Sequence, residues 1–315
     1  MTEPATAVTG KKTLPRKRVA KRPLPKRGRA PSTRRSYRAL IQRMIVYLLL
    51  VLVAVVVIIP LMWAFSASLT PNELVFKYAY PFTWRALLPV NFTLDNYQEL
   101  FTREEGLFTR AVINTLILSF STVFLSVSAS AMAGFAFARF EFPGRDLLFG
   151  LVLLTFMIPA PLTTIPLYIL VTRLGWINTW QALILPGLAN SLVIFVFRQF
   201  FAEIPQDFLD AARVDGASWF RVLTRIILPM SMPVLVTASL LLFLGQWNSF
   251  FWPLLVAPDK KFRVVQVAVS YAYEEHTTRW DLLLAGSTFA ALVPILLVLP
   301  FQRFYVSGLV GGLKE

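Results

Sequence analysis

Few side chains in this sequence could carry covalent chemistry. The chain has one histidine, His276, and no cysteine, so it lacks a thiol nucleophile, a thiolate ligand and a second imidazole to complete a metal site. The G-x-x-x-x-G-K-[ST] loop that cradles nucleotide phosphates is also absent from the sequence. We therefore expect no catalytic residue, no metal site and no cofactor bound by this chain.

The polar groups with the clearest potential role lie inside long apolar segments. They are the amides of Asn114, Asn190, Gln246 and Asn248, with Trp247 between the last two. Amides beside aromatic faces suit the binding of a sugar, and they mark a candidate substrate path. In a membrane, however, such side chains also form hydrogen bonds between helices, and aromatic residues form belts at the interface. Both interpretations of these five residues stay open.

The elements that must position these residues are membrane helices. The chain of 315 residues is 56% hydrophobic and only 15% charged, with a mean hydropathy of +0.62, which is too apolar for an ordinary soluble domain. Crossing the bilayer as a helix takes about 20 residues. Six segments longer than this contain no Asp, Glu, Lys or Arg, and they predict an all-α membrane protein with six transmembrane helices: 44–72, 111–138, 147–172, 174–197, 226–258 and 282–302.

Prolines are expected to bend the third predicted span. Pro159, Pro161 and Pro166 lie inside it, and proline frees backbone carbonyls that a neighbouring helix or a wet cavity must satisfy. A bend beside a pathway and a bend that is simply packed between helices are both open.

The net charge of +14 belongs almost entirely to the amino-terminal segment. Residues 1–43 contain 14 Lys or Arg and one acid, Glu3. We interpret residues 1–38 as a basic, disordered tail and residues 39–315 as the six-helix domain. The positive-inside rule keeps this tail in the cytoplasm against anionic lipid headgroups, so six crossings place both termini in the cytoplasm. A nucleic-acid role is disfavoured because no RNA- or DNA-binding module follows the tail.

A charged segment interrupts the apolar spans at about 203–229. Its stretch "DFLDAARVDGASWFRVLTRIILP" has three Asp and three Arg, and we predict a short helix from Pro205 to Arg213, a turn at Gly216 and a second helix from near Ser218. In the second helix, Trp219, Val222 or Leu223, and Ile226 recur at helical spacing. Three small residues are expected to let another surface approach closely: Ala211, Ala212 and Ala217.

The spacing of this segment resembles the EAA loop of binding-protein-dependent ABC importer permeases. Asp210, Ala211 and Ala212 are followed by Gly216 and then by the run from Ile226 to Pro229. The resemblance implies a coupling loop that sits in a groove of a cytoplasmic ATPase, with Asp210 in place of the family's Glu. Because Asp is one methylene shorter, an ion pair to the ATPase would be longer or would be made by Asp207 or Asp215. The residues implied are Asp210, Ala211, Ala212, Asp215, Gly216, Ala217, Ile226 and Pro229.

The resemblance extends over about 275 residues and is closest to maltose-type, or MalG-like, carbohydrate permeases. It rests on blocks in the same order, such as "GFAFARFEFPGRDLLF", "MIPAPLTTIPLYIL" and "WNSFFWPLLV". It implies the ABC importer type I permease fold in a bacterial cytoplasmic membrane, a second homologous permease, two copies of an ABC ATPase that carry ATP and Mg, an extracytoplasmic solute-binding protein and a sugar substrate. The loop at 271–280 would face the binding protein, and a carboxyl-terminal contact with the ATPase would involve Gly311, Gly312 and Lys314.

Two other classes of function compete with this hypothesis. A secondary transporter or channel that gates itself, with the charged loop lying on the bilayer as an amphipathic segment, is the main alternative. Ion-coupled carriers usually place ionisable residues at mid-membrane, and the six predicted spans have none, which favours an external source of energy. A membrane-embedded enzyme is disfavoured because the chain lacks a nucleophile with its base, a metal cluster and an intramembrane carboxylate.

Overall fold

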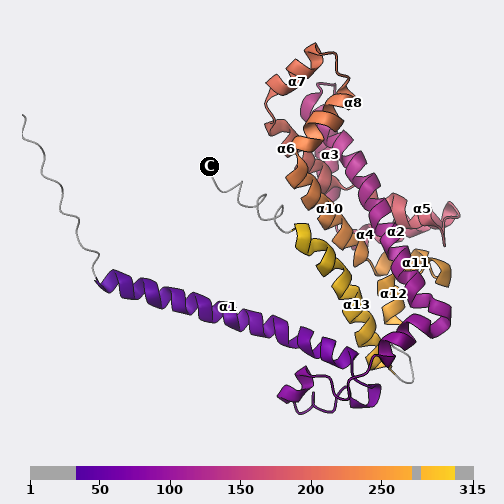
Figure 1. Ribbon diagram of the computed structural model, residues 1–315. Coiled ribbons are helices and arrows are strands. Elements are labelled where there is room, and N and C mark those ends of the chain that lie inside the picture. The colour runs from indigo at the N-terminus through magenta and orange to yellow at the C-terminus, as the bar shows by residue number, and fades with distance from the viewer. Residues whose placement is uncertain (1–32, 272–277, 302–315) are drawn as a thin grey trace, which may run out of the picture. The chain divides into compact units, whose positions relative to one another are not determined.

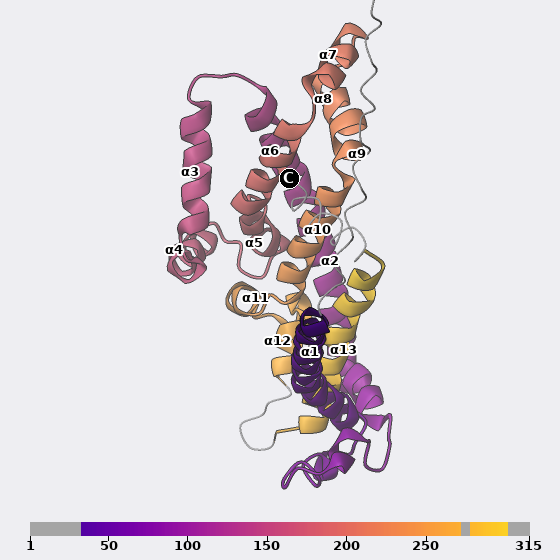
Figure 2. The same cartoon turned by 90° about the vertical axis from the view of Figure 1, so that its left-hand side faces the viewer.

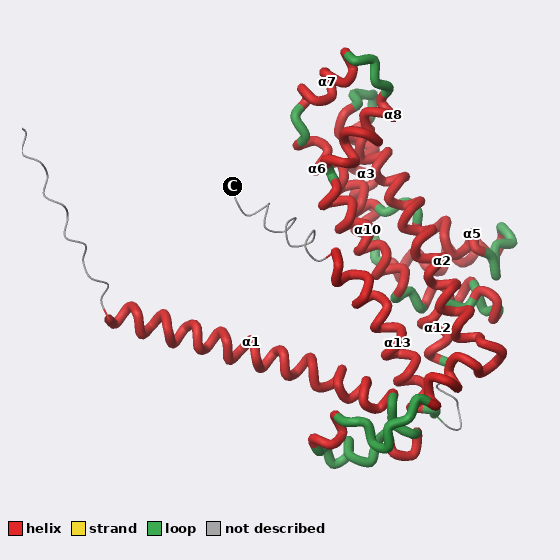
Figure 3. The backbone as a smooth tube through the Cα atoms, viewed as in Figure 1, coloured by secondary structure: helices red, strands yellow, loops and turns green. Residues whose placement is uncertain are grey.

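The computed structural model describes residues 33–271 and 278–301, and for residues 33–39 only the backbone. Throughout these ranges the regular structure is helical, as Figure 3 shows, and this confirms the predicted all-α class. Four features of the sequence lie outside the described residues: most of the basic tail, His276, the centre of the 271–280 loop, and the carboxyl-terminal group Gly311, Gly312 and Lys314.

The chain divides into two units, residues 1–56 and residues 57–315. The division falls inside α1 (Thr33–Ser68), whose segment Leu40–Ser68 is apolar enough to cross a membrane. Helix α1 includes residues 33–38, which the sequence assigns to the tail. The boundary between tail and domain at residue 39 stays a prediction.

Helix α2 is the central element of the second unit. It runs from Asp95 to Arg139, and Figure 1 shows α6 (Ser191–Glu203), α10 (Met232–Trp247) and α13 (Trp280–Val298) packed along it. Helix α2 begins at Asp95, well before the charge-free span that starts at residue 111. A break at 103–106 separates that outer part from the span, and there Glu104, Glu105 and Gly106 have positive φ values of 51°, 55° and 77°.

Three of the predicted spans are sharply bent helix pairs. Helices α3 (Arg145–Met157) and α4 (Ala160–Arg173) meet at 101°, Trp180–Gly187 meets α6 at 42°, and Trp219–Met230 meets α10 at 86°. The first break falls at Pro159, whose missing N–H and fixed φ end α3, so the bend expected in this span is present. Figure 2 shows the α3–α4 pair on the flank of the unit beside α6.

Within residues 33–271 and 278–301, three helices are long and apolar enough to cross a membrane, and the number rises to six if each bent pair counts as one span. The count of six spans is compatible with this fold and stays a prediction. Outside the charged segment, the other elements are short: η1 (Asn72–Leu74), η2 (Trp84–Leu87), α5 (Trp180–Ile184), η3 (Leu185–Gly187), α11 (Phe251–Val256), η5 (Lys260–Phe262), α12 (Val265–Ser270) and η6 (Leu299–Phe301).

The packing of α2 on α6 depends on small side chains. A Cβ atom added at Gly134 would lie 2.8 Å from the Cβ of Phe197 and 3.1 Å from the backbone nitrogen of Arg198. Phe197 is fully buried and belongs to the core that also contains Phe135 and Phe201. Glycine is therefore required at position 134 by the close approach of the two helix backbones.

We expect Gly134→Ala to destabilise the protein although alanine is the better helix former. Its methyl group must push α2 and α6 apart, and such overpacking costs about 1–3 kcal/mol. The thermal unfolding midpoint of the detergent-solubilised protein measures the effect. Gly150→Ala in α3 is the matched control, because a Cβ there meets nothing within 4 Å. A midpoint for Gly134→Ala equal to that of the control would contradict the close contact.

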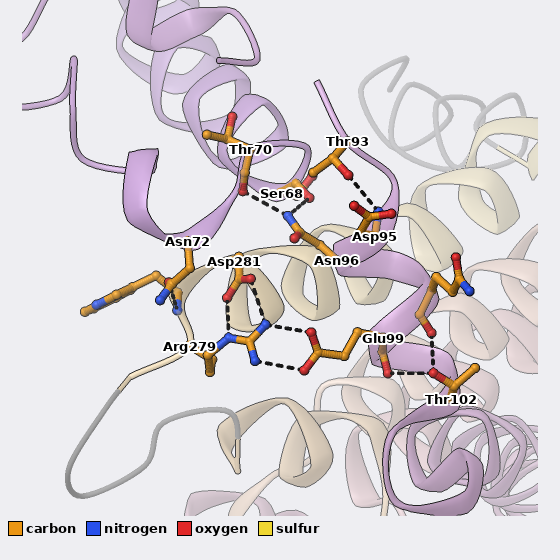
Figure 4. Close-up of polar contacts among 12 residues, drawn as sticks. Ser68, Thr70, Asn72, Thr93, Asp95, Asn96, Glu99, Thr102, Arg279 and Asp281 are labelled. Atoms are coloured by element: carbon orange, nitrogen blue, oxygen red, sulfur yellow. Dashed lines mark hydrogen bonds and ion pairs between the residues drawn. The ribbon is translucent and has the colours of Figure 1, made fainter. Parts of the chain in front are cut away.

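A group of polar contacts lies at the end of the second unit where α2 and α13 begin. We call it the outer clamp, and Figure 4 shows it. It joins the end of α1, the start of α2 and the start of α13. The buried amide of Asn96 donates to the carbonyls of Ser68 and Thr70, each at 2.9 Å, and Asn72 Oδ1 accepts from the backbone N–H of Trp280 at 3.1 Å.

Arg279 makes the ionic contacts of the outer clamp. Its Nη1 and Nη2 donate to both oxygens of Glu99 at 2.8 and 2.7 Å, and its Nε and Nη2 donate to Asp281 at 3.1 and 3.0 Å (Figure 4). These partners, Glu99 first, raise the pKa of Arg279 above its ordinary value. The side chain of Asp281 is 4% exposed and that of Glu99 is 42% exposed. The carboxylate of Asp281 therefore depends on Arg279 to compensate for its lost hydration, whereas the carboxylate of Glu99 remains accessible to solvent.

We expect Arg279→Gln to lower the free energy of unfolding by about 2 kcal/mol, because it leaves the buried carboxylate of Asp281 without its ionic partner. Glu99→Gln should cost less than about 1 kcal/mol, since Glu99 is largely solvated and Arg279 keeps Asp281. Thermal unfolding midpoints of the two variants in the same detergent provide the comparison. Equal losses, or a larger loss for Glu99→Gln, would show that the burial of Asp281 does not decide the stability of the clamp.

Candidate functional site

The charged segment forms a helix–turn–helix at the end of the second unit that lies away from the outer clamp (Figure 1). It consists of α7 (Gln206–Val214), α8 (Trp219–Val222), the π-helical turn η4 (Leu223–Ile227) and α9 (Leu228–Met230). The two predicted helices are present within one residue of their expected starts. This segment joins the end of α6 to the start of α10.

Local sequence explains the turn between the two helices. The backbone N–H of Gly216 donates to the Arg213 carbonyl at 3.0 Å, and that of Ala217 donates to the Ala212 carbonyl at 2.9 Å, so the last carbonyls of α7 are satisfied. Gly216 has φ +76°, which is the left-handed conformation that glycine adopts without strain. The Ser218 hydroxyl then accepts from the N–H of Arg221 and caps α8.

The helix–turn–helix is fixed to α2 and α6 by apolar packing. Leu209, Val222 and Ile227 are fully buried in the core that contains Phe197 and Phe201 of α6.

Helical spacing from Trp219 and Val222 or Leu223 leads to Ile226, but the next residue, Ile227, is the buried one. The π turn adds a residue to the helical register, so Ile227 takes the buried position and Ile226 is only half-buried.

An aromatic cluster reinforces this attachment. The ring of Trp219 lies 5.2 Å from Phe140 and 6.2 Å from Phe135, centroid to centroid. The guanidinium of Arg213 lies 4.8 Å from the centre of the Trp219 ring, and its Nη1 donates to the Ala217 carbonyl at 2.7 Å. Arg213 therefore spans the turn and ties the two helices together.

Two of the three small residues do not face outward as expected. Ala217 is 9% exposed, and Ala212 is half-buried against the same core. Their small size serves the close packing of α7 and α8 on their own chain. Of the three alanines, Ala211 alone is exposed.

The acidic residues of the loop are exposed. Asp210 Oδ1 accepts a hydrogen bond from Gln206 Nε2 at 3.0 Å, one helical turn earlier, and Gln206 Oε1 accepts from Arg139 Nη1 at 3.1 Å. Asp215 lies at the end of α7, and Pro229 lies in the first turn of α9, both exposed.

The loop also carries exposed apolar side chains that the sequence analysis did not single out. Phe208 is 52% exposed, Phe220 68% and Val214 88%. Phe208, Ala211 and Val214 recur every three residues and so lie on one side of α7. We call Phe208, Ala211, Val214 and Phe220 the outer loop face. The three-residue spacing in the sequence could have revealed its α7 part.

The candidate substrate-path residues lie away from this loop and use much of their hydrogen-bonding capacity within the chain. Buried Asn114 donates to the carbonyls of Lys261 and Arg263 at 2.8 and 3.0 Å. The indole of fully buried Trp247 donates to the Ala290 carbonyl at 2.9 Å. These two side chains hold helices and loops together in the way described for polar residues in membranes.

The other three amides of the candidate path are more accessible. Asn190 Oδ1 caps α6 by accepting from the N–H of Val193 at 3.1 Å. Asn248 is exposed, donates to the Leu244 carbonyl and accepts from Gln266 at 3.3 Å, while half-buried Gln246 has no side-chain hydrogen bond within the described part of the chain. At 1.5 Å per residue, the lengths of α6 and α10 place Asn190 and Gln246 about 20 Å from the loop.

The fold and the loop together define a membrane-embedded permease of the ABC importer class. The chain belongs to the family "Binding-protein-dependent transport system inner membrane component", which it matches over residues 126–307. The resemblance inferred from the sequence is thereby confirmed.

Similar proteins agree with this assignment. The chain is 33% identical to the arabinooligosaccharides transport system permease protein AraQ of Halalkalibacterium halodurans, over 83% of this chain and 93% of the relative. It is 31% identical to the sn-glycerol-3-phosphate transport system permease protein UgpE of Salmonella typhi, over 84% and 95%. A chain of a bacterial ABC transporter involved in the import of the acidic polysaccharide alginate has the same fold, with a TM-score of 0.73 and 22% identity, covering 84% of this chain and 96% of that chain.

Proposed function

We propose that this chain is one permease subunit of a sugar importer, and that it couples the closure of separate ATPase subunits to alternating access of a path through the membrane. The observation that carries the proposal is the helix–turn–helix from α7 to α9, which we call the α7–α8 loop. It combines exposed apolar side chains and carboxylates on its outer side with a fully packed inner side.

The energy source and the other subunits lie outside this chain. This sequence has no P-loop, so ATP and Mg are bound by a partner ATPase. Two copies of that ATPase complete the transporter. A second, homologous permease completes the path, and an extracytoplasmic solute-binding protein delivers the sugar. A solved bacterial alginate ABC transporter in complex with alginate pentasaccharide-bound periplasmic protein supports this arrangement by analogy of fold.

The outer loop face is the surface that docks on the ATPase. Val214 and Phe220 are exposed by 88% and 68%, and a partner that covers them removes apolar area from water. Asp207, Asp210 and Asp215 add negative charge around this face and select a partner with basic groups. The coupling prediction for Asp210, Ala211, Asp215 and Gly216 is retained, whereas Ala212, Ala217, Ile226 and Pro229 support the loop or its approach to α10.

The orientation of the chain follows from the docking of this loop in the cytoplasm. The outer clamp, which lies at the other end of the second unit, is then extracytoplasmic. Helix α1 ends at the clamp and α13 begins there, so a single crossing by each helix brings both termini back to the cytoplasm. Gln246, Asn248 and Asn190, whose side chains are the more accessible ones, are the preferred substrate-path residues, and the sugar passes between the two permeases.

The test is purification of the tagged chain from native membranes in a mild detergent, followed by mass spectrometry of the proteins that co-purify. We expect a second multi-span permease and a P-loop ATPase. A stable homo-oligomer that carries no ATPase would refute the importer and favour a self-gating transporter or channel, with the α7–α8 loop lying on the bilayer.

Docking should depend on the turn between the two helices. Gly216→Val forces a β-branched residue into a left-handed conformation, which costs about 1–2 kcal/mol, and we expect it to weaken ATPase binding while the chain still reaches the membrane. Gly216→Asn is the matched control, since asparagine tolerates this conformation and an added Cβ meets nothing within 4 Å. ATPase recovered per mole of permease is the measurement. Equal recovery with both variants would contradict a role for the turn in docking.

A further inference from the structure

Arg139 occupies a special position at the cytoplasmic base of the α7–α8 loop. It is the last residue of α2, and its half-buried side chain reaches across to the end of α6. Its Nη2 donates to the carbonyls of Phe201 and Ile204. These carbonyls belong to the negative end of the α6 dipole, where a guanidinium is favourable both as a donor and as a charge.

The second terminal nitrogen of Arg139 connects this point to α7. Nη1 donates to Gln206 Oε1 at 3.1 Å, and Gln206 Nε2 donates to Asp210 Oδ1 at 3.0 Å. A guanidinium only donates, so it requires the acceptor end of the Gln206 amide. The donor end of that amide is thereby turned toward Asp210.

We propose that Arg139, Gln206 and Asp210 form a relay that fixes the exposed carboxylate of Asp210 relative to α2 and α6, with Arg139 and Gln206 as positioning residues. This inference rests on the proposed docking of the α7–α8 loop on an ATPase. The ligand of the site is a basic group on the ATPase surface, which meets a carboxylate held in one orientation. Movement of the docked ATPase then reaches α2 and α6 through the guanidinium as well as through apolar packing.

The relay explains how an aspartate can serve at this position. A long glutamate reaches its partner by bending several side-chain torsions, and it loses rotamer entropy when it does so. Asp210 has fewer torsions, and its hydrogen bond to Gln206 restricts these before docking. Preorganisation of this kind lowers the entropic cost of binding. The restricted side chain of Asp210 thereby offsets its shorter reach.

The test uses the complete transporter assembled from this chain and the permease and ATPase that co-purify with it. Arg139→Gln removes the guanidinium, and Gln206→Met removes both ends of the amide while keeping its length. We expect each to weaken the binding of the ATPase about tenfold, as for loss of a charge-assisted hydrogen bond. Uptake per ATP hydrolysed in proteoliposomes should fall with it. Arg145→Gln is the matched control, because Arg145 pairs only with neighbouring Asp146 at 3.0 Å within the described residues.

Gln206→Glu separates positioning from a merely structural role. Its carboxylate still accepts from Arg139, and the pair becomes charge-assisted, so the thermal unfolding midpoint should be retained or raised. It can no longer donate to Asp210. We therefore expect weaker ATPase binding without loss of stability, and a normal dissociation constant for this variant would overturn the relay.

A double-mutant cycle provides an independent criterion. If Arg139 acts through Gln206, the double variant Arg139→Gln/Gln206→Met should bind the ATPase no more weakly than Arg139→Gln alone. Losses that multiply would show two independent effects and overturn the proposal. If Arg139→Gln does not fold, the same cycle is measured with Arg139→Lys and Gln206→Met. Lysine keeps the positive charge but cannot donate from two separate nitrogens to α6 and to Gln206.

Phe220→Glu distinguishes failure of the relay from failure of the proposed function. It places a charge on the α8 part of the outer loop face, whereas Gln206 and Asp210 lie on α7. If Phe220→Glu abolishes ATPase binding while Gln206→Met and Arg139→Gln leave it unchanged, the loop docks but the relay is wrong. If Phe220→Glu has no effect either, the docking surface itself is wrong.

Discussion

The contact between α2 and α6 at Gly134 is the constraint on which the rest of the second unit depends. Association of helices in a membrane is not driven by exclusion from water, so it relies on close packing and on interhelical hydrogen bonds. At Gly134 an added Cβ would lie 2.8 Å from the Cβ of Phe197, and the face of α2 leading to it carries buried Ser119, Ser126 and Ser130. Small side chains bring the two backbones together, and the ends of the same two helices that lie away from the outer clamp hold the α7–α8 loop.

The contacts that charged side chains of α2 make lie toward its two ends, outside the charge-free stretch 111–138. At one end, Glu99 and Asn96 join the start of α2 to α13 and to the end of α1. At the other end, Arg139 joins α2 to α6 and α7. Charged groups are costly in hydrocarbon and inexpensive near its boundary. This placement lets a long helix be fixed at both ends without burying a charge in the membrane.

The sequence was sufficient for the fold class and the helix–turn–helix, because these follow from charge-free runs, from Pro205 and Gly216, and from the residue spacing between them. It was insufficient for the direction in which small side chains point. Ala212 and Ala217 pack inward because they join the core that contains Phe135 of α2 and Phe201 of α6, and this core is assembled only in the folded chain. The shift from Ile226 to Ile227 follows from a π turn, which regular helical periodicity does not contain. The hydrogen bonds of Asn114 to Arg263 and of Trp247 to Ala290 join residues that are distant in the sequence, so spacing could not have predicted them.

The loop has to be rigid on one side and open on the other, and its residue types divide accordingly. Leu209 and Val222 are fully buried, whereas Val214 and Phe220 are among the most exposed apolar residues outside the predicted spans. If the loop were loosely held, movement of a docked partner would be absorbed by the loop itself. Apolar packing resists compression, and the hydrogen bonds from Arg139 to the α6 carbonyls resist displacement of the loop along α6. These contacts connect the loop to both α2 and α6, as the proposed coupling requires.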